Sequence, residues 1–320
     1  MKPLLFVLLL ALSSSFLTVE VSASEVRTWT SSDGSSSFEG ELLEFSEDGV
    51  RIQRVSDRKT FQLPLDRLSE ADRAFVQGLI ADERRNTSVA DGPWADQITG
   101  EFQKGTSREG LNFQLFGNPR WKGSERYPLL IWLHGAGQSG SDNEAQMGRP
   151  TRIFSSEAHQ EEYPSFVLAP QCPAREIGWK DSVESDLVAL IEDLVANLPI
   201  DQNRLYVLGS SMGGFGSWRI AANHPDLFAA VVPICGGGRV GDAETLKDIP
   251  IWAFHGDQDT DVPVEKSREM VEAIQGAGGE KIQYSELEGK GHLIAAEVCE
   301  REDLAPWIYG QTLAKSAPAE

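Results

Sequence analysis

The sequence predicts an α/β protein, with a mostly parallel sheet covered by helices on both faces and a small β-rich module before it. One observation in residues 97–313 predicts the sheet. Short apolar runs typical of strands alternate with longer helix-like segments, and such alternation requires crossover connections between parallel strands. A second observation predicts the module, because residues 25–81 contain short runs of period two separated by turn signals.

Length and charge limit the number of domains and the classes of partner that this chain can have. The chain has 320 residues, 40% of them hydrophobic, which suffices for one large domain and a small additional one. Its formal net charge is −20, with a pI near 4.7. Nucleic acids and anionic membranes bind basic patches, so neither is expected as a partner.

The N-terminus resembles a secretory signal. Lys2 supplies a positive charge, Leu4 to Leu12 form an apolar run, and Val21-Ser-Ala23 provides small residues for cleavage. That run is far shorter than the ~20 residues that span a bilayer, and no second apolar span follows. We therefore expect a signal peptide over residues 1–23, no membrane span, and a secreted or periplasmic protein.

Residues 25–81 predict a small barrel-like module. Val50–Ile52 and Phe61–Leu65 alternate with period two, and Ser69 to Asp72 form a capping-box pattern that opens a helix ending at Ile80. Residues 82–96 are polar and charged and are predicted to be a linker. Residues 314–320 are predicted to be a frayed tail.

The module resembles the SH3-like first homology domain of the endocytic adaptor Sla. The resemblance rests on Arg27-Thr-Trp-Thr, Gly40-Glu-Leu, Val50-Arg-Ile, Leu63-Pro-Leu and Leu68-Ser-Glu-Ala-Asp72. It implies a module that could take a peptide or cell-surface ligand. A passive spacer or stability module is the alternative interpretation.

The elements of the large domain follow in order along the chain. One helix is predicted over Ser185–Leu198, where Leu187, Leu190, Ile191 and Leu194 repeat at helical spacing. The other predicted helices are Met212–Asn223 and Val264–Ala277. The predicted strands are Tyr127–Trp132, a run beginning at Leu205, Phe228–Ile234, Ile249–Phe254 and Lys281–Glu286.

A candidate nucleophile lies where one of these strands meets a helix. Residues 209–213 read G-S-S-M-G, the G-x-S-x-G pattern that places a serine on a sharp strand-to-helix turn. A side chain at Gly209 or Gly213 would clash with the neighbouring strand or helix. The turn presents Ser211 beside free backbone N–H groups at the helix start, which favour a developing negative charge.

A serine nucleophile needs a base and an orienting acid. Three aspartates, Asp257, Asp259 and Asp261, follow the strand Ile249–Phe254, and His292 follows the strand Lys281–Glu286. The order serine, aspartate, histidine is that of the α/β-hydrolase scaffold. In such a site Ser211 would attack a carbonyl carbon after losing its proton to His292.

The domain resembles α/β-hydrolase serine esterases of the phospholipase/carboxylesterase and polyhydroxybutyrate-depolymerase-like group. His255-Gly-x-x-Asp259-x-x-Val262-Pro263 matches the group's acid motif. The resemblance covers roughly residues 105–312 and implies Asp259 as the acid and His292 as the base. It also implies an oxyanion hole built from the backbone N–H groups of Ala136 and Met212.

Other patterns in the sequence have competing interpretations. Gly135-x-Gly137-x-x-Gly140 formally matches a dinucleotide fingerprint, but Gly148 and Pro150 would cut short the helix that it requires. Trp179 is predicted to line a substrate pocket or to anchor a loop. No cluster has metal-ligand spacing, so neither a metal nor a cofactor is expected.

Three cysteines allow one disulfide at most. Cys172 and Cys235 both follow predicted strands on the side of the candidate site, which makes them the best candidate pair.

The predicted function is that of an exported serine hydrolase that cleaves carboxylic esters, either small molecules or polymer-linked, through an acyl-enzyme. One alternative is a serine peptidase of the prolyl-oligopeptidase type, because the same triad cleaves amides. The other is a catalytically silent binding protein. The residues do not identify the natural ester.

Overall fold

The computed structural model describes residues 26–46, 48–87, 95–122 and 125–313. The chain divides into two compact units, with the division between Arg84 and Arg85. The predicted signal peptide (residues 1–23) and tail (residues 314–320) lie outside the described residues. In the described residues, no helix is both long and apolar enough to cross a membrane.

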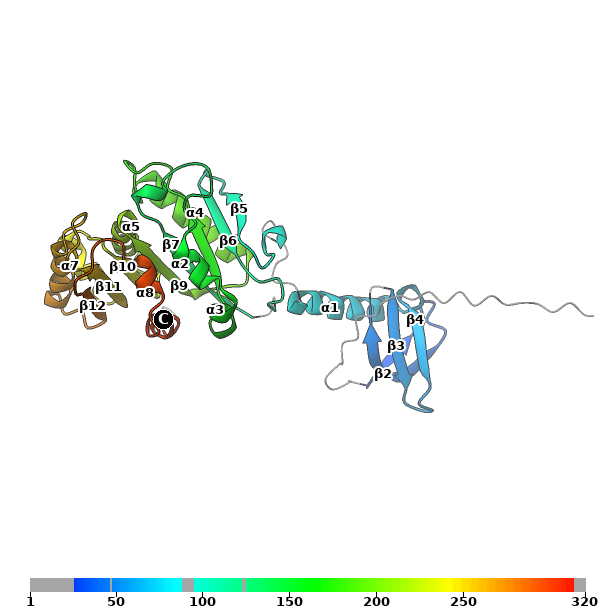
Figure 1. Cartoon of the computed structure of the whole chain (residues 1–320). Coiled ribbons are helices and arrows are strands. Elements are labelled where there is room, and N and C mark those ends of the chain that lie inside the picture. Colours follow the sequence, from blue (N-terminus) through cyan, green and yellow to red (C-terminus); the bar gives the residue numbers. More distant parts are fainter. Residues whose placement is uncertain (1–25, 47, 88–94, 123–124, 314–320) are drawn as a thin grey trace, which may run out of the picture. The chain divides into compact units, whose positions relative to one another are not determined.

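The first unit is an antiparallel four-stranded sheet followed by a helix (Figure 1). The strands pair in chain order, and the helix is α1 (Glu70–Thr87). The strands are β1 (Val26–Thr30), β2 (Ser37–Phe45), β3 (Gly49–Arg54) and β4 (Thr60–Pro64). Val76 of α1 belongs to the same buried cluster as Trp29 of β1 and Ile52 of β3, so the helix is packed on the sheet.

The start of α1 has one of the two hydrogen bonds of the predicted capping box, because the Ser69 N–H donates to Thr30 O instead of to the Asp72 carboxylate. Asp72 N–H donates to Ser69 Oγ (3.2 Å), while the Asp72 carboxylate accepts from Ser69 Oγ (2.8 Å) and Thr30 N–H (2.9 Å). The other end of the helix differs from the prediction, because α1 extends to Thr87 into the segment predicted as a linker. Residues 81–87 contain neither glycine nor proline, so nothing in them stops the helix. Residues 88–94 of that segment are outside the described residues.

The second unit contains an eight-stranded sheet of order β12-β11-β10-β9-β7-β8-β6-β5. All neighbours from β12 to β8 are parallel, whereas β6 runs antiparallel to β8 and to β5. The strands are β5 (Gln103–Thr106), β6 (Asn112–Phe116), β7 (Tyr127–Leu133), β8 (Phe166–Pro170), β9 (Ile200–Ser210), β10 (Ala230–Ile234), β11 (Ile251–Gly256) and β12 (Ile282–Leu287). The mostly parallel sheet predicted from the sequence is confirmed.

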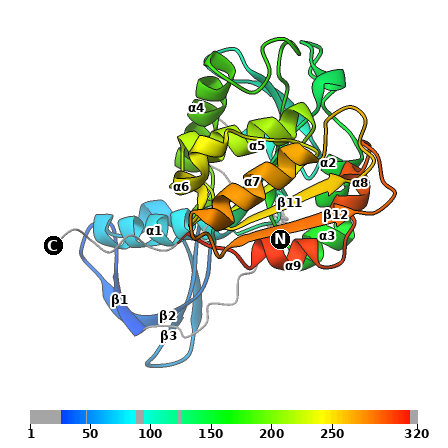
Figure 2. The same cartoon turned by 90° about the vertical axis from the view of Figure 1, so that its left-hand side faces the viewer.

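Helices cover both faces of this sheet (Figure 2). One face carries α4 (Ser182–Asn197), α5 (Met212–Asn223), α6 (Ala243–Leu246) and α7 (Glu265–Gly276). The other carries α2 (Arg149–Phe154), α3 (Glu157–Glu162), α8 (Ala295–Cys299) and α9 (Leu304–Tyr309). Successive residues of β7 alternate between the two cores, with Ile131 in the first and Leu130 and Trp132 in the second, as the pleat of a strand requires.

The candidate disulfide is wrong. Cys172, Cys235 and Cys299 are all free and buried. Cys172 belongs to the core on the α4–α7 face, and Cys235 to the core on the opposite face. The two thiols therefore belong to cores on opposite faces of the sheet, although both follow strand ends. Sequence spacing placed them at one edge of the sheet but could not decide on which face each would lie.

Candidate active site

Ser211 occupies a strained turn between β9 and α5. Its backbone angles are φ 57° and ψ −118°, outside the regions that L-residues ordinarily occupy, at a cost of about 1–3 kcal/mol. The Ser211 N–H donates to Ile234 O of the neighbouring strand β10 (2.9 Å). The conformation is thus held by the sheet, and it places the serine at the carboxyl end of the strands.

Two glycines allow this turn. A Cβ at Gly209 would lie 2.3 Å from Gly213 O, and a Cβ at Gly213 would lie 1.9 Å from Leu133 O. Neither distance leaves room for a carbon atom beside backbone. A side chain would therefore clash at both positions, as the G-x-S-x-G pattern predicts.

The structure brings Ser211, His292 and Asp259 together. Ser211 Oγ lies 2.8 Å from His292 Nε2, and His292 Nδ1 lies 2.7 Å from Asp259 Oδ2. Since a carboxylate only accepts hydrogen bonds, the proton of a neutral His292 sits on Nδ1 and leaves Nε2 free to accept from the serine. This is the arrangement by which an imidazole can remove the proton of a hydroxyl nucleophile.

Asp259 is held more firmly than its two neighbours. Its side chain is fully buried, and its Oδ1 accepts the N–H groups of Asp261 and Val262 (2.9 Å each). Burial raises the pKa of this carboxyl, but the hydrogen bonds from Val262, His292 and Asp261 outweigh burial and leave the pKa below its usual value. Asp257 instead accepts from Gly289 N–H (2.7 Å), and Asp261 is exposed.

His255 is a second histidine at the same carboxylate, which sequence reasoning did not place there. Its Nε2 lies 3.2 Å from Asp259 Oδ2 and 3.0 Å from Val262 O, and the ring is fully buried. Its Nδ1 lies 2.7 Å from Ser267 Oγ. The position of His255 four residues before Asp259, in the same motif, was the one available signal.

The side chains of Cys235, His255 and Asp259 could converge on one cation, since their ligand atoms lie within 4.8 Å of one another. The chemistry of the donors does not suit a metal. Burial and the Asp259 carboxylate raise the pKa of the Cys235 thiol to about 12, which opposes formation of the thiolate that metals bind. Both nitrogens of His255 already have hydrogen-bond partners.

Ala136 and Met212, the two predicted oxyanion donors, each begin a helix and line the same cavity. Met212 is the first residue of α5, and Ala136 the first residue of the short 3-10 helix η3 (Ala136–Gln138). First-turn N–H groups lack an acceptor within their own helix. Both residues line a cavity of about 380 Å³.

His134 and Trp179 hold the loop that follows β7 and contains Ala136. Cys172 N–H donates to His134 Nε2 (2.9 Å), so this nitrogen carries no proton, and Nδ1–H donates to Gly135 O (2.7 Å). Burial lowers the pKa of His134 to about 4. Trp179 Nε1–H donates to His134 O (3.0 Å), and the indole also lines the 380 Å³ cavity. The structure therefore gives Trp179 both of the positions considered from the sequence, as a packed anchor and as a cavity wall.

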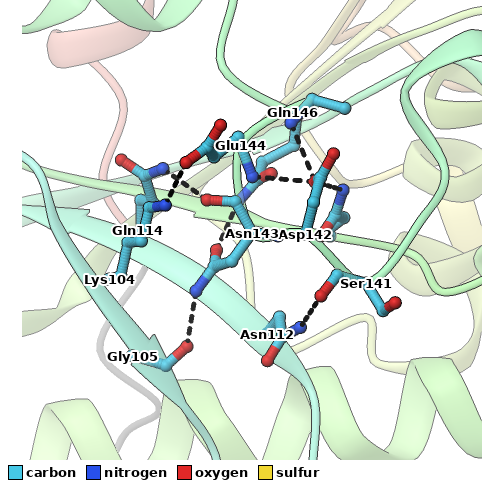
Figure 3. A network of polar contacts seen from close by, with 11 residues as sticks. Lys104, Gly105, Asn112, Gln114, Ser141, Asp142, Asn143, Glu144 and Gln146 are labelled. Atoms are coloured by element: carbon cyan, nitrogen blue, oxygen red, sulfur yellow. Dashed lines mark hydrogen bonds and ion pairs between the residues drawn. The ribbon is translucent and has the colours of Figure 1, made fainter.

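A polar network fixes the next part of this loop (Figure 3). Asn143 is at its centre: its N–H donates to Gln171 Oε1 (2.7 Å), its Nδ2 to Gly105 O (3.0 Å), and its carbonyl accepts from Gln114 Nε2 (2.7 Å). Gln171 Nε2 also donates to Asp142 Oδ1 (2.7 Å). The loop is thus attached to β5, β6 and the end of β8, by residues that sequence reasoning did not single out.

The dinucleotide interpretation of Gly135 to Gly140 finds no support. No long helix opens at Gly140; the next helix, α2, has six residues and begins at Arg149.

Part of the chain matches a known family. Residues 176–249 match the model of the prolyl oligopeptidase family. This segment contains Ser211 and ends before Asp259 and His292. It covers less than half of the chain.

Three individual similarities are to proteins named as hydrolases. The chain is 29% identical over 150 residues to a probable feruloyl esterase C of Aspergillus terreus (46% of this chain, 54% of that protein). It is 28% identical over 134 residues to poly(3-hydroxyalkanoate) depolymerase C of Paucimonas lemoignei (39% and 32%). It is 34% identical to a thermostable esterase of known crystal structure, with a TM-score of 0.62 over 66% of this chain and 62% of that one.

The chain thus spans about half or less of the first two proteins and under two thirds of the third. More distant solved structures, at 12–15% identity and TM-scores of 0.51–0.55, bear on the fold alone. With the sheet order and the turn at Ser211, they define the fold class: the second unit has the α/β-hydrolase fold, as predicted.

Proposed function

We propose that this protein is a serine hydrolase that cleaves carboxylic esters. The observation that carries the proposal is the continuous chain of hydrogen bonds from Ser211 Oγ through His292 to the buried Asp259. Support comes from the similarity to a thermostable esterase at 34% identity. The backbone N–H groups of Ala136 and Met212, at the starts of two helices that line one cavity, are the proposed electrophilic part of the site.

The geometry gives each residue a role. His292 Nε2 takes the proton of Ser211 as Oγ attacks the ester carbonyl carbon, and Asp259 stabilises the imidazolium that forms. The N–H groups of Ala136 and Met212 stabilise the oxyanion, each such donor being worth about 10²–10³ in rate. The alcohol leaves with the proton from His292. Water, deprotonated by the same imidazole, then hydrolyses the acyl-enzyme.

Labelling with a fluorophosphonate tests the nucleophile. We expect one label per chain, hydrolysis of 4-nitrophenyl acetate, and loss of both in Ser211→Ala. Ser210→Ala is the matched control, because Ser210 is the last residue of β9 and is not bonded to His292. It should keep both properties. Full activity of Ser211→Ala would refute the proposal, and an unlabelled, inactive wild type would favour a silent binding protein.

A serine peptidase is the second candidate, because residues 176–249 match the prolyl oligopeptidase family. The same triad can cleave an amide, whose leaving group also takes its proton from His292. An ester and an amide of one acyl group separate the two functions. An esterase should show kcat/KM for the ester well above that for the peptide bond, and a peptidase should cleave both.

We also propose export, on the signal-like pattern over residues 1–23, and a binding role for the N-terminal unit. That unit resembles the SH3-like module in its motifs, and it has a hollow of about 560 Å³ whose lining includes Trp29, Phe38 and Arg67. Its ligand would be a peptide or a cell-surface component. N-terminal sequencing of the protein from culture medium or periplasm would test export, with Ser24 as the expected first residue.

A further inference from the structure

The cavity beside Ser211 is built from two segments. The loop that precedes α4 supplies Arg175 to Lys180, and the exposed face of α5 supplies Phe215 and Arg219. Its remaining wall includes Ala136 and Met212, the proposed oxyanion donors. A group attached to an ester bound at Ser211 would therefore extend into this space of about 380 Å³.

Part of the cavity is apolar. Ile177 and Phe215 are each 40% exposed, unusual for large hydrophobic side chains. Trp179 forms a packed wall, because α5 approaches it closely: a Cβ on Gly216 would lie 2.6 Å from Trp179 Cβ. These surfaces suit a hydrocarbon or ring portion of a ligand.

The charged groups of the cavity are not balanced. Arg219 is paired, since its Nε donates to Glu184 (2.7 Å) and its Nη2 lies 3.4 Å from Asp181. Arg175 and Lys180 have no ion-pair partner within the described part of the chain. The one acidic residue of the lining is Glu176. Two unpaired cations beside the nucleophile stand out in a chain of formal net charge −20.

We propose that the substrate is an ester that also carries a negatively charged group, such as a carboxylate, and that Arg175 and Lys180 hold this group. The inference rests on the proposed esterase function and names the substrate class of the same site. A guanidinium binds a carboxylate through two parallel hydrogen bonds, and an ammonium adds a point charge. Ile177 and Phe215 cover the carbon atoms between the ester and the charge.

Matched ester pairs test the proposal. Monomethyl adipate and methyl 5-carbamoylpentanoate differ in charge on the acyl side, and 3-carboxyphenyl and 3-carbamoylphenyl acetate differ on the alcohol side. The charge ratio is defined as kcat/KM of the anionic member divided by that of the neutral member. In one pair we expect a ratio of about three to ten at low salt, falling towards one at high salt because screening weakens the attraction. The net charge of the whole protein would give the opposite preference.

Variants assign the effect to the cavity. Arg175→Gln and Lys180→Gln should each lower the charge ratio, and the double variant should bring it close to one. Glu176→Gln should raise it, because a like charge is removed. Lys281→Gln is the matched control: Lys281 precedes β12, at the opposite edge of the sheet from the carboxyl strand ends, and its loss should leave the ratio unchanged.

Two outcomes would overturn the inference and are distinguishable. If the neutral esters are hydrolysed but both charge ratios stay at or below one, or if the double variant keeps the wild-type ratio, the substrate class is wrong and the esterase function stands. If none of the esters is hydrolysed and Ser211 is not labelled by a fluorophosphonate, the proposed function fails and this inference fails with it.

Discussion

Asp259 Oδ2 lies within hydrogen-bond distance of two histidines, 2.7 Å from His292 Nδ1 and 3.2 Å from His255 Nε2. His255 Nε2 faces only acceptors, Asp259 Oδ2 and Val262 O, so this nitrogen must carry a proton. Ser267 Oγ lies 2.7 Å from the other nitrogen of His255 and 3.0 Å from Gly236 O, and its single proton can serve one of the two. His255 is therefore a second donor that orients the carboxylate, at the same oxygen that His292 contacts.

The first prediction concerns this second histidine. In His255→Asn the carboxylate of Asp259 loses a donor and its fixed position, so we expect kcat/KM to fall by about ten- to a hundredfold. Ser267→Ala keeps the imidazole and removes only its outer partner, so it should cost less than His255→Asn. A thermal melt run beside the kinetics separates a loss of orientation from a loss of fold. Full activity in folded His255→Asn would contradict the assigned role.

A second prediction compares three neighbouring carboxylates. Asp259→Asn should lower kcat by about 10⁴, because an amide favours the wrong tautomer of His292. Asp257→Asn should stay within about tenfold of wild type, since its amide oxygen can still accept from Gly289 N–H. Asp261→Asn should do the same, because its side chain is exposed. A crippled Asp261→Asn would mean that the acid has been misassigned.

The sequence predicted the parts of this site that are defined by local chain geometry. Ser211 needs Gly209 and Gly213 within two residues, and His255 to Pro263 form one contiguous motif, so short windows contain the information. Asn143 is different, because its partners Gly105 and Gln171 lie 38 and 28 residues away. No periodicity or motif connects these positions. Only the packing of β5, β6 and β8 brings them together.

The same distinction explains why the end of α1 and the state of the cysteines differ from the predictions. The predicted end of α1 at Ile80 rests on the polarity of the residues that follow it. A polar segment without glycine or proline can continue a helix, and α1 extends to Thr87. Cys172 and Cys235 were paired because both follow strand ends. The choice of sheet face depends on the path of each loop, which strand order alone does not determine.

A third prediction follows from the buried His134. Its folded-state pKa, lowered by burial to about 4, lies below the usual 6.5. As the pH falls from 7 to 4, the unfolded chain binds a proton that the folded protein does not, so stability is lost across this window. The loss is about 3 kcal/mol in the free energy of unfolding. His159, whose pKa burial also lowers to about 4, adds in the same direction. Asp259 contributes only at lower pH, because its pKa is below 3.8.

Urea unfolding at pH 7 and pH 4 measures this difference, and His134→Gln isolates the contribution of one residue. The amide oxygen of glutamine can accept from Cys172 N–H but cannot take up a proton. The variant should therefore lose less stability than wild type over the same interval. An identical pH dependence in both proteins would exclude His134 as the source.

The turn at Ser211 gives a fourth prediction. Gly213→Ala would place a carbon 1.9 Å from Leu133 O, so β7 and α5 would have to separate. We expect a loss of several kcal/mol in the free energy of unfolding, or failure to fold. Gly137→Ala is the matched control in the same region, because a Cβ there has nothing within 4 Å. Its stability should stay within about 0.5 kcal/mol of wild type. Equal stability of the two variants would contradict the close approach.

The last prediction concerns the independence of the two units. The chain divides between Arg84 and Arg85, and every residue proposed to take part in catalysis lies beyond position 130. A chain consisting of residues 91–320 should therefore fold and hydrolyse 4-nitrophenyl acetate at close to the full-length rate. If the N-terminal unit binds a polymer or a cell-surface component, its removal should lower turnover only on esters attached to that target, through lost effective concentration. Equal rates on all esters would favour a spacer, and an insoluble or inactive product would show that the second unit depends on the first.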